Sequence, residues 1–387
     1  MAISNLFDVG GAEINTRHLV ECLQELGQNI QVISMWKPAN LDIKFRVHGI
    51  CFKGKNPPYL PRHLRNFWLM AYMFTETILV AIHEKIDVFH AHMVLPTGFP
   101  VVLACRLLRK TVIVSTRGSD LNIFAYKLLF KPFAKFTLKK ADAIIALSRG
   151  LEKKALKLGV PKDRIFVIPN GVDTTVFCVK DGNRCRSKLN VKMEDKVVLF
   201  VGTIESYRRK IKGLEYLLSA MKTVISRVPT ARLMVVGVPP LPDLLDNVLK
   251  LGIEKHVSFL GVVPHENMPM YYCACDVFVL PSLMEGCPTT VLEAMALAKP
   301  VVALDIEGCR DLIEDGINGF LVSPTNANAL AEKIIQVITN DELAVQLGKE
   351  ARKIVETQYS WESVTKKTVT LYATVLSMAS KINAICD

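Results

Sequence analysis

The sequence predicts an α/β protein made of two Rossmann-like domains in series. First, its 387 residues, half of them hydrophobic, exceed the size at which one core usually stops growing. Second, apolar residues recur in short β-branched runs, as at 196–204 and 232–237, separated by stretches of helical spacing. Third, this alternation, which is typical of parallel βα units, restarts midway along the chain.

The first half opens with an expected strand at 3–7 and a helix at 12–26. Its other expected strands lie at 29–35, 86–92, 111–116, 143–148 and near 165. The most apolar stretch, 67–82, is interrupted by Glu76 and is shorter than a bilayer requires. We therefore expect a largely buried helix there rather than a membrane span.

A polar segment at 178–196 separates the two halves, and we expect it to be irregular and to contain the domain boundary. The second half then has expected helices at 213–225 and 289–298. Its expected strands lie at 196–204, 232–237, 257–261, 276–282, 300–305 and 319–323. The predicted domains are 1–178 and 179–360, and residues 361–387 form a helix that returns to the first domain.

The cysteine pattern and the N-terminus indicate a cytoplasmic protein. The ten cysteines include no CxxC pair, which argues against a disulfide framework and for a reducing compartment. Cys273 and Cys275 lie in an apolar setting that favours core packing over zinc binding. No basic region followed by an apolar run opens the chain, so we expect no signal peptide.

The net charge is concentrated in the first half. Residues 1–180 contain 25 Lys and Arg against 13 Asp and Glu, or +12, whereas the remainder has 23 against 24, or −1. This asymmetry favours an anionic surface or substrate for the first domain. Because no zinc-finger, RNP or basic-zipper pattern is present, nucleic acid is not the expected partner.

Residues 123–140, IFAYKLLFKPFAKFTLKK, interleave lysines with Phe and Leu. Lysines four residues apart share one helical face, opposite the phenylalanines, which suits an anionic membrane surface, here the inner face of the membrane. An ordinary surface helix with its apolar side on the core fits equally well, and Pro132 would interrupt it.

The stretch LMEGCPTTVLEAMALAKPVVALD, residues 283–305, suggests a ligand site. Pro288 suits a helix start, where backbone N–H groups beside Gly286 are exposed to an anion such as a phosphate. Glu285 precedes this start and Glu293 lies about one turn inside the helix, where its carboxylate suits the hydroxyls of a ribose. The pattern fits a nucleotide sugar; two solvated glutamates near a helix N-terminus are the alternative.

This stretch, with DLIEDGINGFLVSP after it, closely resembles the retaining glycosyltransferases of family 4, which have the GT-B fold. The likeness runs from FDVGGAE to YSWESV, nearly the whole chain. It implies two Rossmann-like domains facing each other across a deep cleft, with Glu285 at the donor sugar and Glu293 at the ribose. The residues near the phosphates would be Gly286, Cys287, Pro288, Thr289 and Thr290.

The family's other donor element is a Gly-Arg turn followed by Lys-Gly, and it is similar to VGTIESYRRKIKGLEYLL, residues 201–218, which include Gly202. Lys212 matches the family lysine that contacts the diphosphate, where a cation neutralises the leaving group. Thr203 stands where many members have Arg. The substitute cation would come from the loop residues Arg208, Arg209 or Lys210, or these are simply a solvated basic loop.

In the first domain, Gly10 and Gly11 resemble the family's mobile glycine loop at an acceptor site. The resemblance favours His92 over His90 as the strand-end histidine facing the cleft. Arg117 stands where many members have His, and because Arg cannot act as a base near neutral pH, it is expected to hold a phosphate or hydroxyl. Asp120 would orient the acceptor or the neighbouring loop.

The resemblance implies transfer of a hexose or related sugar from a nucleoside diphosphate to an acceptor hydroxyl, with retention, in glycan, glycolipid or polysaccharide synthesis. Given the basic first domain, the expected acceptor is lipid-linked or a membrane-surface glycan. No D-x-D metal motif is present, so no metal and no cofactor are expected. A sugar-nucleotide epimerase, a phosphorylase-like enzyme and a non-catalytic nucleotide-sugar binder stay open as alternatives. A dinucleotide dehydrogenase is least favoured, because no G-x-G-x-x-G follows an N-terminal strand.

Overall fold

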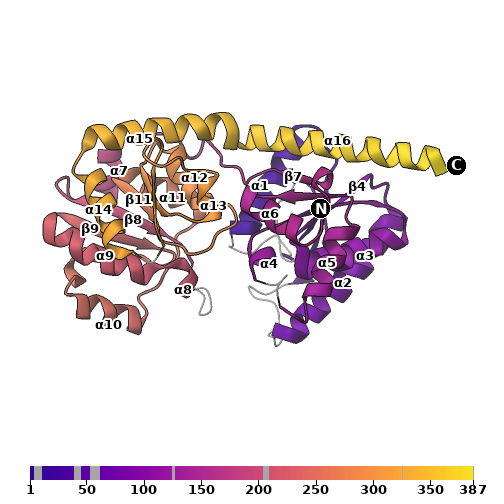
Figure 1. Cartoon of the computed structure of the whole chain (residues 1–387), viewed down its shortest axis with the longest axis horizontal. Coiled ribbons are helices and arrows are strands. Elements are labelled where there is room, and N and C mark those ends of the chain that lie inside the picture. Colours follow the sequence, from indigo (N-terminus) through magenta and orange to yellow (C-terminus); the bar gives the residue numbers. More distant parts are fainter. Residues whose placement is uncertain are drawn as a thin grey trace. The chain divides into compact units, whose positions relative to one another are not determined.

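The computed structural model describes the chain except residues 4–10, 39–44, 53–61, 124–126, 204–208, 325 and 387. Side chains of 2–3, 36–38, 50–52, 62–66, 209–210 and 381–386 also lie outside the description. The chain divides into two compact units (Figure 1). Unit 1 comprises Met1–Gly171 and Trp361–Asp387, and unit 2 comprises Val172–Ser360.

Unit 1 contains a parallel seven-stranded sheet with the order β3-β2-β1-β4-β5-β6-β7. Its strands are β1 (Ala2–Ile3), β2 (Gln31–Pro38), β3 (Arg46–Phe52), β4 (Val88–His92), β5 (Thr111–Ser115), β6 (Ala143–Ala146) and β7 (Ile165–Val167). The sequence pattern missed β3. The first expected strand continues past Ile3 into residues outside the description.

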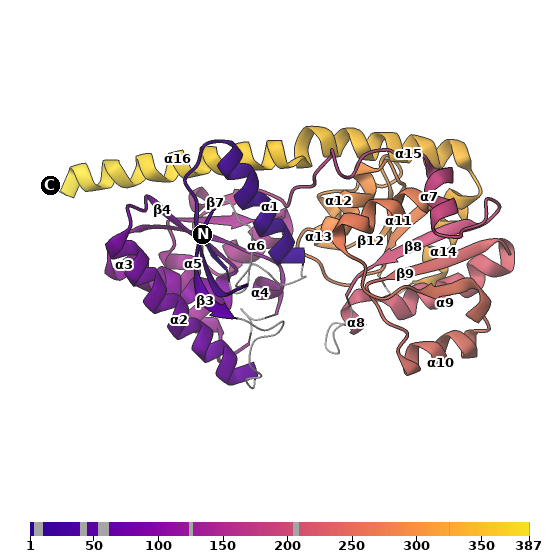
Figure 2. The same ribbon diagram turned by 180° about the vertical axis from the view of Figure 1, so that it is seen from behind.

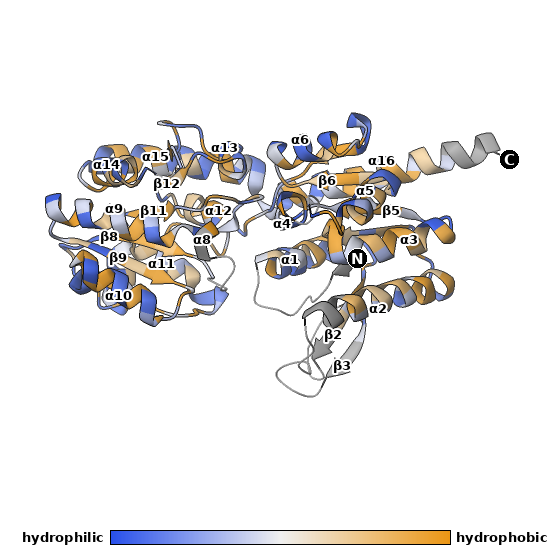
Figure 3. Cartoon of the chain, turned by 60° about the horizontal axis from the view of Figure 1, so that its bottom comes forward, coloured by the Kyte–Doolittle hydropathy of each residue, from blue (hydrophilic) through white to orange (hydrophobic). Residues whose placement is uncertain are grey.

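The helices of unit 1 cover both faces of this sheet. They are α1 (Gly11–Glu25), α2 (Arg62–His83), α3 (Phe99–Leu107), α4 (Ser119–Asn122), α5 (Lys131–Lys140), α6 (Arg149–Lys157) and α16 (Trp361–Cys386). Ile113 of β5 packs in a core with α1 and α16, whereas Val114 faces the turn before α3, because successive strand residues alternate between faces. Helices α1 and α16 lie side by side (Figure 2), and α2, α3 and α5 form the opposite layer (Figure 3).

Two expectations for these helices are corrected. Helix α2 is not largely buried, because one of its faces exposes apolar side chains such as Phe67, which is 72% exposed. Helix α5 begins at Lys131 with Pro132 in its first turn, so the proline starts the helix instead of interrupting it.

Unit 2 contains a parallel six-stranded sheet with the order β10-β9-β8-β11-β12-β13. Its strands are β8 (Lys196–Val201), β9 (Ala231–Val236), β10 (Val257–Phe259), β11 (Val277–Leu280), β12 (Val301–Leu304) and β13 (Phe320–Val322). Its helices are α7 (Gly182–Lys188), α8 (Arg209–Lys212), α9 (Leu214–Arg227), α10 (Pro242–Leu251), α11 (Met268–Ala274), α12 (Thr289–Ala296), α13 (Glu307–Arg310), α14 (Ala327–Ile338) and α15 (Asp341–Ile354).

The segment between the two sheets is more ordered than its composition suggests. It contains α7, whose N-terminus is capped by Asp181 through hydrogen bonds from the amides of Asn183 and Arg184. The expectation that residues 178–196 are irregular is therefore wrong for the residues of α7. The contacts divide the chain at Gly171, seven residues before the boundary drawn from the sequence at 178.

Candidate functional site

The first group of candidate residues lies at the carboxyl end of the sheet in unit 2. The strand order reverses between β8 and β11, and ligands of open α/β sheets bind at such a reversal. The loop after β8 leads into α8 and the loop after β11 leads to Glu285. The amide of Leu283 donates a 2.7 Å hydrogen bond to the carbonyl of Ile211, which ties the two loops together.

Lys212 and Glu285 form an ion pair across these loops. The Nζ atom of Lys212 lies 2.8 Å from Oε1 of Glu285, and the two side chains are 22% and 16% exposed. Gly213 has a φ of 67° and packs so closely on Pro281 that a Cβ would overlap its carbonyl oxygen. The backbone next to Lys212 is thereby held against β11, which aims the ammonium at Glu285.

Helix α12 begins directly after this pair. Gly286, Cys287 and Pro288 are buried and the following two threonines are half-buried. Pro288 occupies the N-cap position and supplies no side-chain cap, and the helix start carries partial positive charge. Both the ammonium of Lys212 and this helix start can therefore face an anion here.

Glu293 is more enclosed than the sequence suggests. Its side chain is buried, and it accepts hydrogen bonds from the Tyr272 hydroxyl at 2.7 Å and from Nε2 of His265 at 2.9 Å. The hydrogen bond to Glu293 raises the pKa of His265, and burial raises the pKa of Tyr272. Both carboxylate oxygens therefore have partners in this structure. The sequence reasoning missed His265 and Tyr272, and no local signal pointed to them.

Several predicted residues are only partly described. Arg208 and Gly10 lie outside the described residues, and so do the side chains of Arg209 and Lys210. Thr203 is exposed. Gly202 packs near Lys212, whose Cδ would lie 3.8 Å from an added Cβ. Gly11 starts α1, and no described atom lies within 4 Å of a Cβ added there.

A second group of candidate residues lies at the carboxyl end of the sheet in unit 1. His92 ends β4 beside Ser115, which ends β5, and Arg117 follows two residues later. The guanidinium of Arg117 donates to Nδ1 of His92, to Oγ1 of Thr16 at 2.9 Å and to Oδ1 of Asn170 at 3.1 Å. These contacts join α1, β4 and the Asn-Gly turn after β7. Sequence reasoning did not find Thr16 or Asn170.

His92 presents an unused donor. Because Arg117 donates to Nδ1, the proton of the neutral ring is assigned to Nε2. Burial, His90 and Arg117 lower the pKa of His92 well below the usual value, so the ring is neutral near pH 7. Its Nε2 is buried and has no hydrogen-bond partner among the residues that the structure describes. In contrast, His90 uses both nitrogens, with Tyr372 and Ser115 at 2.7 Å each.

Asp120 organises the loop that carries Arg117. Its fully buried carboxylate accepts hydrogen bonds of 2.9 to 3.1 Å from the amides of Val94, Arg117, Gly118 and Leu121. Burial raises the pKa of Asp120, while these amides favour its charged form. Asp120 thus joins the segments after β4 and β5. Of the two roles expected from the sequence, orienting the acceptor or the neighbouring loop, these hydrogen bonds correspond to the second.

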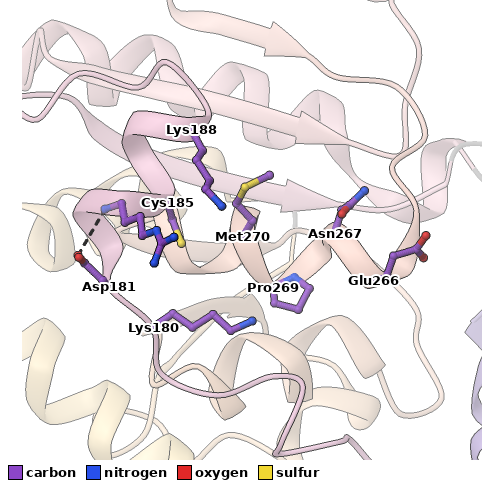
Figure 4. Close-up of a pocket in the computed structure, with 9 residues that line it drawn as sticks. Lys180, Asp181, Cys185, Lys188, Glu266, Asn267, Pro269 and Met270 are labelled. Carbon is purple, nitrogen blue, oxygen red and sulfur yellow. Dashed lines mark hydrogen bonds between the residues drawn. The ribbon is translucent and has the colours of Figure 1, made fainter.

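A cavity of about 500 Å³ lies between α7 and α11 (Figure 4). Lys180, Lys188 and Met270 are among its lining residues, but neither Lys212 nor Glu285 is. Within the described part of the chain, no three His, Cys, Asp or Glu side chains are grouped to hold a metal ion. In the same part, no helix is both long and apolar enough to cross a membrane.

Two family models match the chain in tandem. "Glycosyltransferase Family 4" matches residues 9–176, and "Glycosyl transferases group 1" matches residues 182–354. The chain belongs to glycosyltransferase family 4. It is therefore an enzyme that transfers sugars from nucleotide sugars, and the expected non-catalytic alternative is set aside.

The relatives and solved structures agree with this family. An uncharacterized glycosyltransferase of Methanocaldococcus jannaschii is 28% identical over 384 residues, covering 96% of each chain. Sucrose-phosphate synthase from Thermosynechococcus elongatus is 24% identical, with a TM-score of 0.81 over 97% of this chain and 98% of that chain. Anabaena HepE, solved with UDP and glucose, is 20% identical, with a TM-score of 0.78 over 96% and 98%. The fold of this glycosyltransferase is GT-B, with one Rossmann-like domain in each unit.

Proposed function

We propose that this glycosyltransferase moves a hexose or related sugar from a nucleoside diphosphate to an acceptor hydroxyl, with retention of the anomeric configuration. The observation that carries the proposal is the Lys212–Glu285 ion pair at the strand-order reversal of unit 2, directly before the start of α12. A diphosphate seated against the ammonium and the helix start leaves its sugar near the carboxylate of Glu285.

In this proposal the enzyme positions and neutralises rather than supplying a base. The bond between the anomeric carbon and the diphosphate oxygen breaks, and a bond from the same face of that carbon to the acceptor oxygen forms. The acceptor proton passes to the departing phosphate, and Lys212 stabilises the negative charge that develops there. In unit 1, the Nε2–H of His92 is a donor for a hydroxyl oxygen of the substrate, and Arg117 holds His92 in that tautomer.

For the nucleotide, we propose that a ribose binds by displacing His265 from Glu293. Oε1 of Glu293 is held by His265, whose side chain is 30% exposed, whereas the hydroxyl of fully buried Tyr272 holds Oε2. Because Anabaena HepE was solved with UDP-glucose, UDP is the first nucleotide to test.

We propose that the reaction needs no divalent metal, because an ammonium and a helix start can carry the charge of the leaving group. Activity that survives EDTA is the expected result. Loss of activity in EDTA with rescue by Mn²⁺ contradicts this part of the proposal.

We also propose that the enzyme works in the cytoplasm at the inner face of the membrane, on a lipid-linked or membrane-surface acceptor. The support is the net charge of +12 in residues 1–180 against −1 in the remainder.

The deciding experiment has two steps. A thermal-shift panel of UDP, GDP, ADP and their sugars identifies the donor, since a ligand that binds only the folded state raises the melting temperature. If the sugar of that donor is α-linked to the diphosphate, the product is then examined by NMR, and an α-linkage to the acceptor is expected. A β-linked product contradicts retention; sugar release that depends on free phosphate indicates a phosphorylase, and conversion of the donor without any acceptor indicates an epimerase.

A further inference from the structure

From Phe67 onward, where its side chains are described, helix α2 has an exposed face without Lys, Arg, Asp or Glu. The exposed residues from Phe67 to the end of the helix are Phe67, Trp68, Ala71, Thr75, Leu79, Ile82 and His83. Phe67 is 72% exposed and Ile82 is 62% exposed, so this face is open along most of the helix. Glu76 is half-buried and pairs with His48 at 3.5 Å instead of joining the face. Helix faces in contact with water ordinarily carry charged and polar residues, so this face is expected to be covered.

A second apolar group lies at the start of α5. Leu128 and Leu129 are 90% and 73% exposed, and Phe130 and Phe133 are each 38% exposed. The ring of Phe133 packs edge-on against Phe99 of α3 at 4.9 Å, which fixes this group to the helix layer. Single exposed apolar residues are common on folded proteins, but neighbouring apolar residues that are this exposed indicate an interaction site.

The two groups lie on helices of one layer, and their exposed residues together are here named the helix-layer face. Helices α2 and α5 both pack against α3, on the same side of the sheet in unit 1 (Figure 3). Leu107, the last residue of α3, is 65% exposed and adds to this layer. Lysines at positions 127, 131, 135, 139 and 140 are exposed around the apolar group of α5. The nearby acid Asp142 is already paired with Arg106 at 2.7 Å.

We propose that the helix-layer face docks unit 1 on an anionic lipid bilayer, with α2 and the start of α5 inserted at the interface and the α5 lysines at the headgroups. Aromatic and leucine side chains beside lysines are the combination that interfacial helices use. This inference rests on the membrane-surface part of the proposed function and names the surface that would achieve it. It does not depend on which donor or acceptor binds.

The charges favour a bilayer over a second copy of the chain. Two copies meeting through this face would bring their rows of α5 lysines together, and like charges across an interface are strongly unfavourable. An anionic bilayer instead offers negative headgroups to the lysines and a hydrocarbon boundary to Phe67, Trp68 and Leu128.

Vesicle flotation of the full chain tests the proposal. Vesicles of phosphatidylcholine alone are compared with vesicles in which about a third of the lipid is phosphatidylglycerol, a fraction that makes the surface potential clearly negative. We expect binding to the anionic vesicles that weakens as salt is added. Two double variants should each lower the vesicle affinity at least tenfold. One carries Leu128→Ser and Leu129→Ser, and the other carries Lys131→Gln and Lys135→Gln.

A matched control uses exposed leucines of unit 2. Leu245 and Leu249 on α10 are 40% and 60% exposed, and replacing both by Ser should leave vesicle binding unchanged. Equal loss in this control pair, or no binding of the parent chain to either vesicle, overturns the proposal. A Leu128→Ser and Leu129→Ser variant that floats normally but turns a dimer into a monomer overturns it in favour of a second copy.

Trp68 provides an independent readout of α2. Trp68 is 48% exposed and Trp361 is only 8% exposed, and the side chain of the third tryptophan, Trp36, lies outside the described residues. The emission is therefore measured in a chain that carries Trp36→Phe, where a blue shift on anionic vesicles should come from Trp68. Trp68→Phe should float like the parent chain but lose that shift. A shift that persists in Trp68→Phe contradicts insertion of α2. The rise in melting temperature with UDP, measured on every variant, reports on unit 2 separately. A chain that floats with anionic vesicles but is not stabilised by UDP supports docking and contradicts the proposed donor.

Discussion

The hydroxyl of Tyr272 donates a 2.7 Å hydrogen bond to Oε2 of Glu293, and both side chains are buried in unit 2. His265 holds the other carboxylate oxygen from a half-buried position. Tyr272 therefore orients the carboxylate from behind, whereas His265 occupies the oxygen that is nearer to solvent. This difference separates a structural partner from one that a nucleotide can replace.

Tyr272→Phe should lower the free energy of unfolding by about 2 kcal/mol, because it leaves one oxygen of a buried carboxylate without a donor. Urea unfolding measures the change. Tyr271→Phe, at the neighbouring half-buried position, is the matched control and should have little effect. Equal stability of the two variants would show that the hydrogen bond to Glu293 contributes nothing.

His265→Gln should change the pH dependence of stability. The pKa of His265 is raised in the folded chain by its hydrogen bond to Glu293, so the charged ring stabilises the fold below about pH 6.5, its unfolded pKa. That contribution is lost as the pH rises through the raised folded pKa. Melting temperatures of parent and variant should therefore differ most at acidic pH and converge at alkaline pH. A gap that widens with rising pH contradicts the assignment.

Lys212→Met should lower kcat by roughly a hundredfold or more, since one fixed group that stabilises developing charge is lost. Lys212→Arg keeps the charge and should recover part of the rate. Steady-state kinetics with the donor from the thermal-shift panel measure both. If Lys212→Met raises KM and leaves kcat unchanged, Lys212 binds the donor without stabilising the leaving group.

Asp120→Asn should lower the free energy of unfolding by about 2 kcal/mol or more, because an amide group replaces an oxygen that accepts backbone N–H bonds in a buried site. Its activity should fall too, since Asp120 holds the segment that carries Arg117. Asp181→Asn is the control: Asp181 is an exposed N-cap, where Asn serves equally well. Chemical denaturation should show Asp181→Asn within about 0.5 kcal/mol of the parent chain; similar losses in both would contradict the buried role of Asp120.

Gly213→Ala and Gly252→Ala separate backbone strain from close packing. Both glycines have positive φ, 67° and 70°, but an added Cβ meets Pro281 only at Gly213 and finds nothing within 4 Å at Gly252. Gly252→Ala should cost about 1 kcal/mol of stability from the left-handed conformation alone. Gly213→Ala should cost clearly more and weaken donor binding, because α8 must move from β11. Thermal melts with and without UDP measure both effects, and equal costs would rule out the packing argument.

Local patterns were sufficient where the physics is local. The β-branched runs at 86–92 and 276–282 became β4 and β11, since burial on both faces of a parallel sheet requires continuous apolar residues. The helix expected at 289–298 became α12, whose start is marked by Pro288. The glycosyltransferase family was recognisable because its motif lies within one continuous stretch, 283–305.

What the sequence by itself determined is the alternation of strands and helices and the place of Glu285 just before a helix start. Tertiary structure alone decided which groups meet: Tyr272 and His265 with Glu293, and Thr16 and Asn170 with Arg117. It also decided that the apolar stretch 67–82 exposes one face. The physical reason is that periodicity along a chain defines the faces of each element, whereas the partner of each face depends on packing between elements far apart in sequence.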